Sequence, residues 1–299
     1  MVNMEYIPAK HLLHRNKSTE WFGTDHTMNL YRGCCHGCLY CDSRSSCYQN
    51  PDFDQVKAKV DALRVLRDDL ARKVKPAFIT MGSMSDPYNP FERELQLTRH
   101  ALELIDAYQC GVAAATKSDL IARDVDLYRM IQDHSPVICK LTVTTTDDAL
   151  AARIEPYAPP PSRRLAALEK LSRAGVFSGI LLMPVLPFVE DSRENVLSVV
   201  DSAAQSGARF IYAAFGVTMR DGQRDYFLNG LDRAFPGQGT GEKYRKRYGS
   251  RYYCPSPRAR ELWELFSRRC RELGLLCEMK HIISAATRNY EDRQLSFFE

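Results

Sequence analysis

Three cysteines near the start of the chain have a spacing that could carry chemistry. Four cysteines fall within eight residues, namely Cys34, Cys35, Cys38 and Cys41. Cys34, Cys38 and Cys41 form the pattern C-x3-C-x2-C, and thiolates bind iron–sulfur clusters or zinc. Three cysteines can hold three irons of a [4Fe–4S] cube and leave the fourth iron open to a small molecule. This arrangement indicates catalysis rather than a purely structural site.

A closed zinc site is the alternative for this segment. Zinc in a structural site takes four ligands, and Cys35, His36 or Cys47 could supply the fourth. Cys34 and Cys35 do not easily share one cube, because adjacent side chains diverge in an extended loop. The other cysteines are scattered, so we expect metal binding in a reducing compartment rather than a disulfide framework.

The elements that must position these cysteines form a repeating pattern. Short apolar runs alternate with amphipathic stretches, which predicts βα units and a parallel sheet covered by helices. The predicted strands are Met28–Tyr31, Ala77–Met81, Val112–Ala115, Val137–Thr144, Phe177–Met183 and Phe210–Phe215. The predicted helices between them are Phe53–Val74, Glu92–Tyr108, Asp119–Asp133, Ser162–Ala174 and Glu194–Ser206. Six units are too few for the usual eight-stranded closure, so the α/β fold is expected to be a partial, open barrel.

Extensions flank this core on both sides. Residues 1–27 form an N-terminal extension, residues 28–215 the (βα)6 core and residues 216–287 a C-terminal α/β extension. In the C-terminal extension, helical patterns cover Asp221–Phe235 and Ser256–Leu273, and a Gly-rich basic loop lies between them. Leu275–Lys280 is expected to be a strand. Residues 288–299 are expected to be an exposed tail.

Composition excludes several classes of protein. The chain has 299 residues, of which 44% are apolar and 26% charged, as in ordinary globular proteins. No run approaches a membrane span, and the first residues lack the apolar core of a secretory signal. We therefore expect a cytoplasmic protein without a membrane partner. The net charge of +4 permits a nucleic-acid partner without requiring one.

The cysteine motif resembles the signature of radical S-adenosylmethionine (SAM) enzymes. The matching residues are Tyr31-Arg32-Gly33-Cys34 and Cys38-Leu39-Tyr40-Cys41. Residues 28–215 resemble more closely the branch of spore photoproduct lyase, also called DNA repair photolyase-like. The resemblance implies a (βα)6 radical SAM barrel in which Cys34, Cys38 and Cys41 ligate a [4Fe–4S] cluster. It also implies reductive cleavage of SAM to a 5′-deoxyadenosyl radical, with electrons from a donor such as flavodoxin or ferredoxin.

The resemblance also implies the residues that contact SAM. Tyr40 would lie near the adenine and has a counterpart in the hydrogen-transfer relay of the lyases. Ser85 and Asp86, after the second strand, would accept hydrogen bonds from the SAM ammonium group. After the third strand, Lys117 would pair with the SAM carboxylate and Ser118 would reach the ribose. The alternatives are a turn at Ser85-Asp86 and a helix cap at Ser118.

Two positions depart from the lyase pattern. Met84 stands where the lyases have a cysteine that donates a hydrogen atom, and a thioether has no such hydrogen. Asp42 follows the last motif cysteine, where some lyases have a tyrosine. The lyase reaction itself is therefore not implied, and Tyr88 and Cys139 are further candidates for a relay.

A basic and aromatic segment is the candidate nucleic-acid contact. Cations could bind phosphates while tyrosines stack on bases. The candidate residues are Lys243, Arg245, Lys246, Arg247, Tyr248, Arg251 and Tyr252. A solvated basic loop is the alternative.

The last residues resemble a short peptide that docks on bacterial sliding clamps. The anchors would be Gln294, Leu295, Phe297 and Phe298, and such a partner favours DNA. The leading hypothesis is thus a radical SAM enzyme acting on DNA, as in lesion repair, or on another nucleic acid. The alternatives are a radical SAM enzyme that modifies a peptide or small metabolite, and a non-enzymatic iron–sulfur or zinc redox module.

Overall fold

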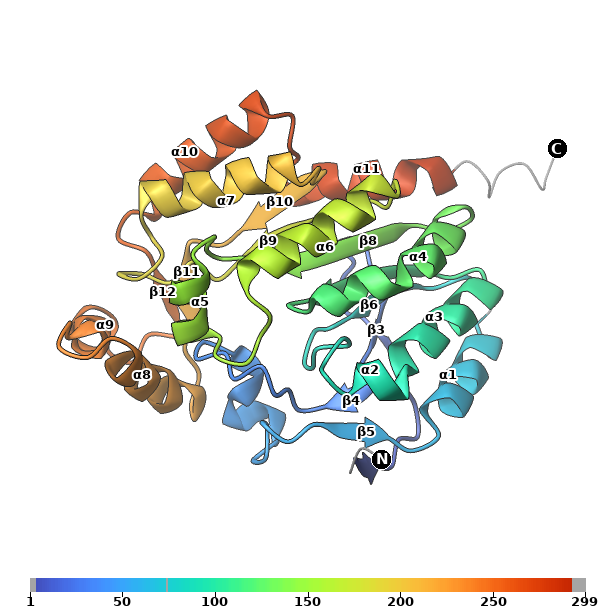
Figure 1. Cartoon of the computed structure of the whole chain (residues 1–299). Coiled ribbons are helices and arrows are strands. Elements are labelled where there is room, and N and C mark those ends of the chain that lie inside the picture. The colour runs from blue at the N-terminus through green and yellow to red at the C-terminus, as the bar shows by residue number, and fades with distance from the viewer. Residues whose placement is uncertain (1–3, 74, 292–299) are drawn as a thin grey trace.

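Six parallel strands form the centre of the structure, a computed structural model that describes residues 4–73 and 75–291. Each strand is hydrogen-bonded to the next one in chain order. They are β3 (His26–Met28), β6 (Phe78–Met81), β7 (Gly111–Thr116), β8 (Val137–Thr142), β9 (Ser178–Leu182) and β10 (Phe210–Ala213). β10 lies at one edge of the sheet (Figure 1), and the antiparallel β2 (His14–Arg15) lies at the other. The prediction of an open, partial (βα)6 barrel is confirmed.

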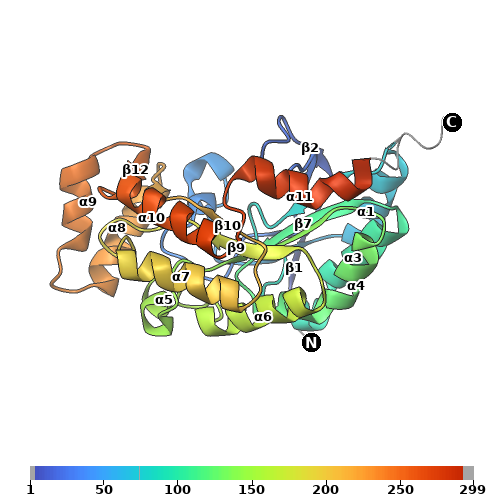
Figure 2. The ribbon, with the colours of Figure 1, turned by 90° about the horizontal axis from the view of Figure 1, so that it is seen from above.

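Helices cover the outer face of this sheet, while segments of the N-terminal and C-terminal extensions pack on its inner face. The outer helices include α3 (Leu97–Ala107), α4 (Val125–Gln132), α6 (Pro161–Arg173) and α7 (Arg193–Gln205), which lie along one side of the sheet in Figure 2. α11 (Met279–Glu291) lies along the opposite side. There Ile282 of α11 and Phe22 of the N-terminal extension pack with Phe78 and Phe210 of the strands. Residues of both extensions therefore fill the inner face of the sheet at this place.

The first predicted strand and the first predicted helix are each divided differently in the structure. β3 ends at Met28, and Tyr31–Arg32 forms β4 of a separate sheet with β5 (Lys57–Lys59) and β1 (Glu5–Ile7). The predicted helix Phe53–Val74 was wrong over its first part. Val56 and Ala58 are buried while Lys57 and Lys59 are partly exposed, which is the period of two of a strand. Only α1 (Ala62–Ala71) is helical there.

The intervening helices otherwise follow the predicted positions. Glu92–Tyr108 is split into α2 (Glu92–Leu95) and α3 because Gln96 takes a left-handed conformation with φ of 50°. A short helix, α5 (Asp148–Ile154), was not predicted. α8 (Gln223–Ala234) and α10 (Ala259–Glu272) match the two helices expected in the C-terminal extension.

Two expectations for the C-terminal extension were wrong. The expected basic loop is α9 (Thr240–Tyr248), because Tyr244 and Tyr248, four residues apart, bury one helical face. The expected strand Leu275–Lys280 is reduced to a bridge between Leu276 and Phe210. α11 continues to Glu291, so the first part of the expected tail is helical. A two-stranded sheet of β11 (Gly216–Thr218) and β12 (Tyr253–Pro255) was not predicted. No helix in residues 4–73 and 75–291 is long and apolar enough to cross a bilayer.

Candidate active site

A cavity of about 340 Å³ lies at the carboxyl ends of the parallel strands, where α/β folds place their sites. The loop after β3, here called the cysteine loop (residues 33–41), forms one wall, and the loop after β6 forms another. The ends of β7, β8 and β9 and the segment after β10 complete it. The lining includes Cys34, His36, Cys38, Tyr40, Cys41, Met84, Ser85, Asp86, Thr116, Lys117, Thr142 and Met183. The predicted cluster cysteines and four of the predicted SAM contacts therefore face one space.

Cys38 is buried beside this cavity, and Cys34 and Cys41, which also line it, are half-buried. Burial raises the pKa of Cys38 to about 12, and it also raises the pKa values of Cys34 and Cys41. The negative charge of Asp86 raises the pKa of Cys34 further, as do Cys38 and Cys41 when they are ionised. Thiols in this setting stay protonated unless a cation replaces the protons, and iron or zinc does so on binding.

The motif residues fit a cluster better than a single metal ion. Within the described ranges, no three His, Cys, Asp or Glu side chains are gathered closely enough to hold one ion. A cube offers each cysteine a separate iron, so it suits thiols spread around a shared cavity. The alternative zinc ligands do not line the cavity, apart from His36, whose Nε2 is bonded to Asp86. Cys35 packs against the hydrophobic core between the sheet and its outer helices, and Cys47 is exposed.

Contacts with two other segments fix the path of the cysteine loop. The amide of Cys34 donates to the carbonyl of Phe53 at 2.8 Å, and the amide of Leu39 donates to Ile154 at 2.9 Å. Gly33 has φ of 82°, and a Cβ there would lie 2.3 Å from the carbonyl oxygen of Gln55. Only glycine permits this close approach, which explains the residue before the first motif cysteine.

Asp86 is the polar centre that joins the cysteine loop to the sheet. Its Oδ1 accepts hydrogen bonds from the Tyr88 amide at 2.8 Å and the Thr116 hydroxyl at 2.6 Å. Its Oδ2 accepts from Nε2 of His36 at 3.0 Å and from the Lys117 amide at 2.9 Å. Burial alone would raise the pKa of Asp86, but the His36 charge and these hydrogen bonds lower it to about 2. The carboxylate is thus ionised and already accepts four hydrogen bonds.

A second buried network holds Tyr40. Its hydroxyl donates to Glu155, and Glu155 pairs with Arg164 at 2.5 Å. Arg164, which is fully buried, also donates to the carbonyl of Thr142 at 2.9 Å. Burial would raise the pKa of Glu155, but the charges of Arg164 and Lys117 lower it. The network fixes the tyrosine of the motif against the end of β8.

Lys117 places a positive charge beside Cys38 and Cys41. Its Nζ lies 5.3 Å from the centre of the Tyr40 ring. Burial would lower its pKa, but the carboxylate of Glu155 raises it, as does Cys38 whenever that thiol is ionised, so the amine is charged at neutral pH. A cation here suits a carboxylate ligand in the cavity.

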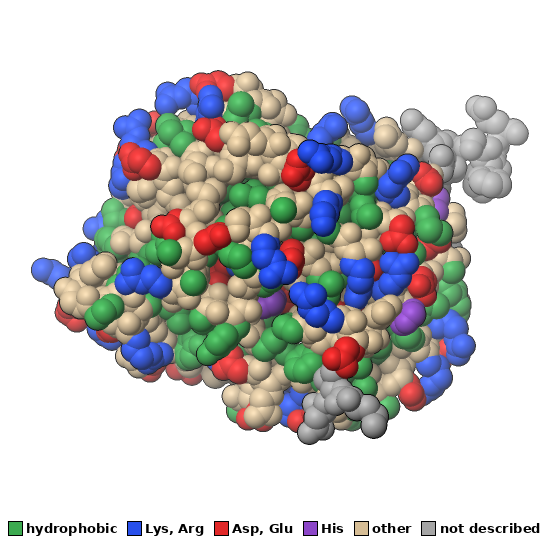
Figure 3. All heavy atoms as spheres, in the orientation of Figure 1, with side chains coloured by type: hydrophobic (Ala, Val, Ile, Leu, Met, Phe, Trp, Pro, Cys, Tyr) green, Lys and Arg blue, Asp and Glu red, His purple; other side chains and the backbone are tan. Residues whose placement is uncertain are grey.

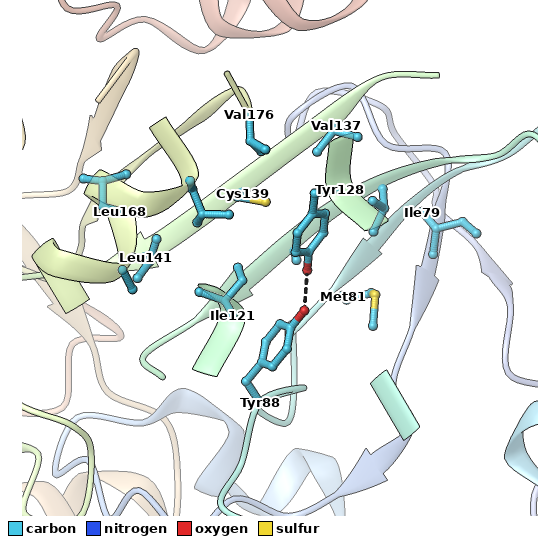
Figure 4. Close-up of a cluster of buried hydrophobic side chains, with 14 of the residues drawn as sticks. Ile79, Met81, Tyr88, Ile121, Tyr128, Val137, Cys139, Leu141, Leu168 and Val176 are labelled. Carbon is cyan, nitrogen blue, oxygen red and sulfur yellow. Dashed lines mark hydrogen bonds between the residues drawn. The ribbon is translucent and has the colours of Figure 1, made fainter. Parts of the chain in front are cut away.

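Several candidates from the sequence lie elsewhere. Ser118 does not line the cavity, and its hydroxyl accepts from the Leu120 amide at 3.3 Å as a cap. Tyr88 and Cys139 lie between the sheet and its helices, where the Tyr88 hydroxyl is 2.8 Å from that of Tyr128 (Figure 4). Met84 lines the cavity and is 41% exposed at its rim.

The sequence did not single out Asp86 as an acceptor from His36 or Thr116. From the sequence His36 is predicted only as a possible zinc ligand, and Thr116 has no predicted role. The carboxylate and its partners are 50 and 30 residues apart in the chain. Polar residues that end neighbouring parallel strands were the available signal, since such strand ends meet at one edge of the sheet.

The predicted nucleic-acid residues occupy α9 and the turn after it. Lys243, Lys246 and Arg247 are exposed, and Figure 3 shows Lys and Arg side chains projecting at the end of the molecule that α8 and α9 form. Tyr248 is buried and donates to the carbonyl of Pro255 at 2.5 Å, so its ring is not free to stack on a base.

The remaining residues of this set differ in their partners. Arg245 is paired with Asp232 at 3.1 Å. Arg251 and Tyr252 are exposed in the turn after α9. The predicted clamp residues Gln294, Leu295, Phe297 and Phe298 lie outside the described residues.

A partial parallel barrel with three motif cysteines at its carboxyl end defines a class of enzyme, and comparisons identify the family. The model of the radical SAM superfamily matches residues 28–200. The chain belongs to the radical SAM superfamily. An uncharacterized protein of Mycobacterium tuberculosis (strain H37Rv) is 31% identical over 244 residues, which are 79% of this chain and 71% of that protein. An uncharacterized protein of Methanocaldococcus jannaschii is 31% identical over 56% of this chain and 63% of its own length.

Solved structures confirm the fold. Spore photoproduct lyase complexed with dinucleoside spore photoproduct has a TM-score of 0.65 at 14% identity, over 91% of this chain and 81% of that chain. A variant of that lyase with bound AdoMet and the same dinucleoside has a TM-score of 0.61 at 16% identity, over 89% and 78%. The radical SAM methyltransferase TsrM of Kitasatospora setae, with bound tryptophan, reaches 0.51 at 11% identity, over 83% and 51%. The predicted membership of the superfamily and the predicted enzyme class are confirmed.

Proposed function

We propose that Cys34, Cys38 and Cys41 hold a [4Fe–4S] cluster that cleaves SAM reductively. The observation that carries this proposal is the placement of the three thiols around one cavity at the carboxyl end of a radical SAM barrel. When bound, the cluster would supply one electron to SAM, whose C5′–S bond would break to give methionine and the 5′-deoxyadenosyl radical that abstracts a hydrogen atom from a substrate. A small reductant such as flavodoxin or ferredoxin would deliver the electron.

The residues around the cavity have distinct roles in this proposal. The Lys117 ammonium group pairs with the SAM carboxylate, and Tyr40 lies beside the adenine. Asp86 supplies negative charge for the SAM ammonium group, while its four protein hydrogen bonds hold the cysteine loop and the end of β7 in register. The Ser85 hydroxyl donates to the Tyr31 carbonyl at 3.0 Å, so its lone pairs remain as acceptors toward the cavity. Ser118 acts as a helix cap beside the site.

We propose a nucleic acid, DNA in particular, as the substrate. Two observations support this: structures of a similar fold bind a dinucleoside lesion, and exposed cations project from α9. The rim residue Met84 has no transferable hydrogen on its sulfur, so the hydrogen donor differs from a cysteine at this position. Gln294–Phe298 would recruit the enzyme to DNA through a sliding clamp, and the enzyme would act in the cytoplasm.

Product analysis tests the substrate class. Protein reconstituted anaerobically with iron and sulfide is given SAM and dithionite, and 5′-deoxyadenosine is measured with and without UV-irradiated DNA. Irradiated DNA should raise the rate of 5′-deoxyadenosine formation above that seen with undamaged DNA. A rate that responds to peptides or small metabolites and not to any nucleic acid would refute the nucleic-acid proposal while leaving SAM cleavage intact.

A further inference from the structure

A second cavity, here called the side cavity, adjoins the cavity at the carboxyl ends of the parallel strands, which is called the cluster cavity from here on. It has a volume of about 370 Å³ and shares Ser43, Phe53 and Met84 with the first cavity. Its other walls come from the N-terminal extension, β4, β5 and the segment after the cysteine loop. The remaining lining residues are His11, Leu12, His14, Asn29, Tyr31, Arg32, Gly33, Tyr48, Gln49, Asn50 and Lys59. The two cavities are therefore adjacent, with Ser43, Phe53 and Met84 at their common boundary.

The side cavity has positively charged walls. Arg32 and Lys59 line it, together with two histidines, and no described lining residue is an aspartate or glutamate. Among the described residues neither Arg32 nor Lys59 has an acidic partner, although Arg32 donates to the Gln49 carbonyl at 2.6 Å. Burial and the charge of Arg32 lower the pKa of Lys59. Two cations that repel each other without a counter-charge form a site that an anion would stabilise.

The neighbouring lysine on the same strand shows the contrast. Lys57 and Lys59 are two residues apart on β5 and therefore lie on one face of that strand. Lys57 is paired with Glu5 at 2.9 Å and does not line the side cavity. The strand thus carries one lysine that is paired with Glu5 and one lysine that lines the cavity and has no acidic partner among the described residues.

Aromatic and amide side chains complete the lining. Phe53 is buried in the wall common to both cavities, and Tyr48 is half-buried. Asn29, Gln49 and Asn50 supply amide groups that donate and accept hydrogen bonds. Cations for phosphate, aromatic rings for stacking and amides for base edges are the three groups with which proteins hold single-stranded nucleic acid.

We propose that the side cavity binds the phosphodiester and the adjacent nucleotide of a nucleic-acid strand whose reacting nucleotide occupies the cluster cavity. This inference rests on the nucleic-acid function proposed above and names the part of the site that holds the substrate strand. Arg32 and Lys59 contact the phosphate. Met84, at the common rim, separates the two nucleotides.

Binding of a labelled single-stranded DNA of about 12 nucleotides tests the proposal, a length within the range that one binding groove covers. The reconstituted protein is compared with Arg32→Met, Lys59→Met and the control Lys57→Met over a series of salt concentrations. Each of the first two changes should weaken binding by about tenfold at low salt. Each should also reduce the slope of log K against log salt by about 0.7, the loss expected for one phosphate contact on a single strand. Lys57→Met should bind like the unchanged protein.

Two further measurements separate the outcomes. SAM binding, followed by equilibrium dialysis, should be the same in all four proteins and shows that the cluster cavity is intact. If Lys59→Met and Arg32→Met bind DNA as Lys57→Met does, the side-cavity proposal is wrong while the nucleic-acid function stands. If the unchanged protein binds no DNA, the proposed nucleic-acid function fails. Loss of thymidine monophosphate binding in Lys59→Met without loss of DNA binding would identify a free nucleotide as the occupant and overturn the proposal.

Discussion

Replacing Lys140 with methionine should stabilise the protein at neutral pH. Lys140 lies on β8, is 1% exposed, and its Nζ has no hydrogen-bond partner in the part of the chain that the structure describes. The amine lies 4.3 Å from the centre of the Phe22 ring inside the barrel. Methionine keeps a chain of similar length and removes the ionisable group.

The magnitude follows from the pKa of this amine. Burial lowers the pKa of Lys140 to about 7, from an ordinary value of about 10.4 for lysine. Each pKa unit corresponds to about 1.4 kcal/mol, so the lysine costs at most ~5 kcal/mol below pH 7. Because the contact with Phe22 recovers part of this cost, we expect the variant to be more stable by roughly 2–4 kcal/mol at pH 7.

The dependence on pH identifies the cause. Between about pH 7 and 10.4 the unfolded chain holds a proton on Lys140 that the folded chain lacks, so stability of the unchanged protein rises with pH in this window. The variant lacks this slope, and its advantage should shrink as pH rises. Urea unfolding at pH 6.5, 8 and 9.5 measures both quantities. A variant that is less stable than the unchanged protein by the same amount at every pH would refute the reasoning and show that the amine is charged and satisfied.

Three other experiments test the buried ion pair, the role of Asp86 and the clamp proposal. Glu155→Gln leaves the fully buried Arg164 without its charge partner and should lower the free energy of unfolding in urea by about 3–5 kcal/mol. The control Glu169→Gln, in an exposed ion pair with Arg173, should change it by less than ~1 kcal/mol. Equal effects of the two changes would show that burial does not strengthen the Glu155–Arg164 pair. Asp86→Asn weakens the bonds to His36 and Lys117, so reconstituted iron and SAM affinity should both fall, and normal values of both would exclude the proposed roles. A peptide of residues 288–299 should bind a bacterial sliding clamp in fluorescence anisotropy, and Leu295→Ala with Phe298→Ala should abolish binding; a peptide that does not bind contradicts the clamp proposal.

The sequence predicts the fold where one periodic pattern dominates. Five of the six parallel strands lie where they are predicted, because their apolar runs alternate with helical patterns and end at turn residues, whereas the prediction Met28–Tyr31 overlaps β3 only at Met28. Short elements were missed when charged residues masked the pattern. β5 contains only Lys-Ala-Lys, and the basic run of α9 hides the buried pair Tyr244 and Tyr248.

The candidate site was partly visible in the sequence because the motif cysteines are close along the chain. The hydrogen bonds of Asp86 and the pairing of Lys57 but not Lys59 depend on segments that only folding brings together. Spacing along the chain does not encode which side chains already have partners. For this reason the side cavity could not be recognised from the sequence.

The most direct test of the central claim is SAM cleavage by reconstituted protein. With dithionite, the protein should bind about four irons per chain and convert SAM to 5′-deoxyadenosine. Cys34→Ala, Cys38→Ala and Cys41→Ala should each lose the cluster and this activity, while Cys35→Ala should keep both. Stoichiometric zinc without iron uptake, or a full complement of iron without any 5′-deoxyadenosine, would contradict the account.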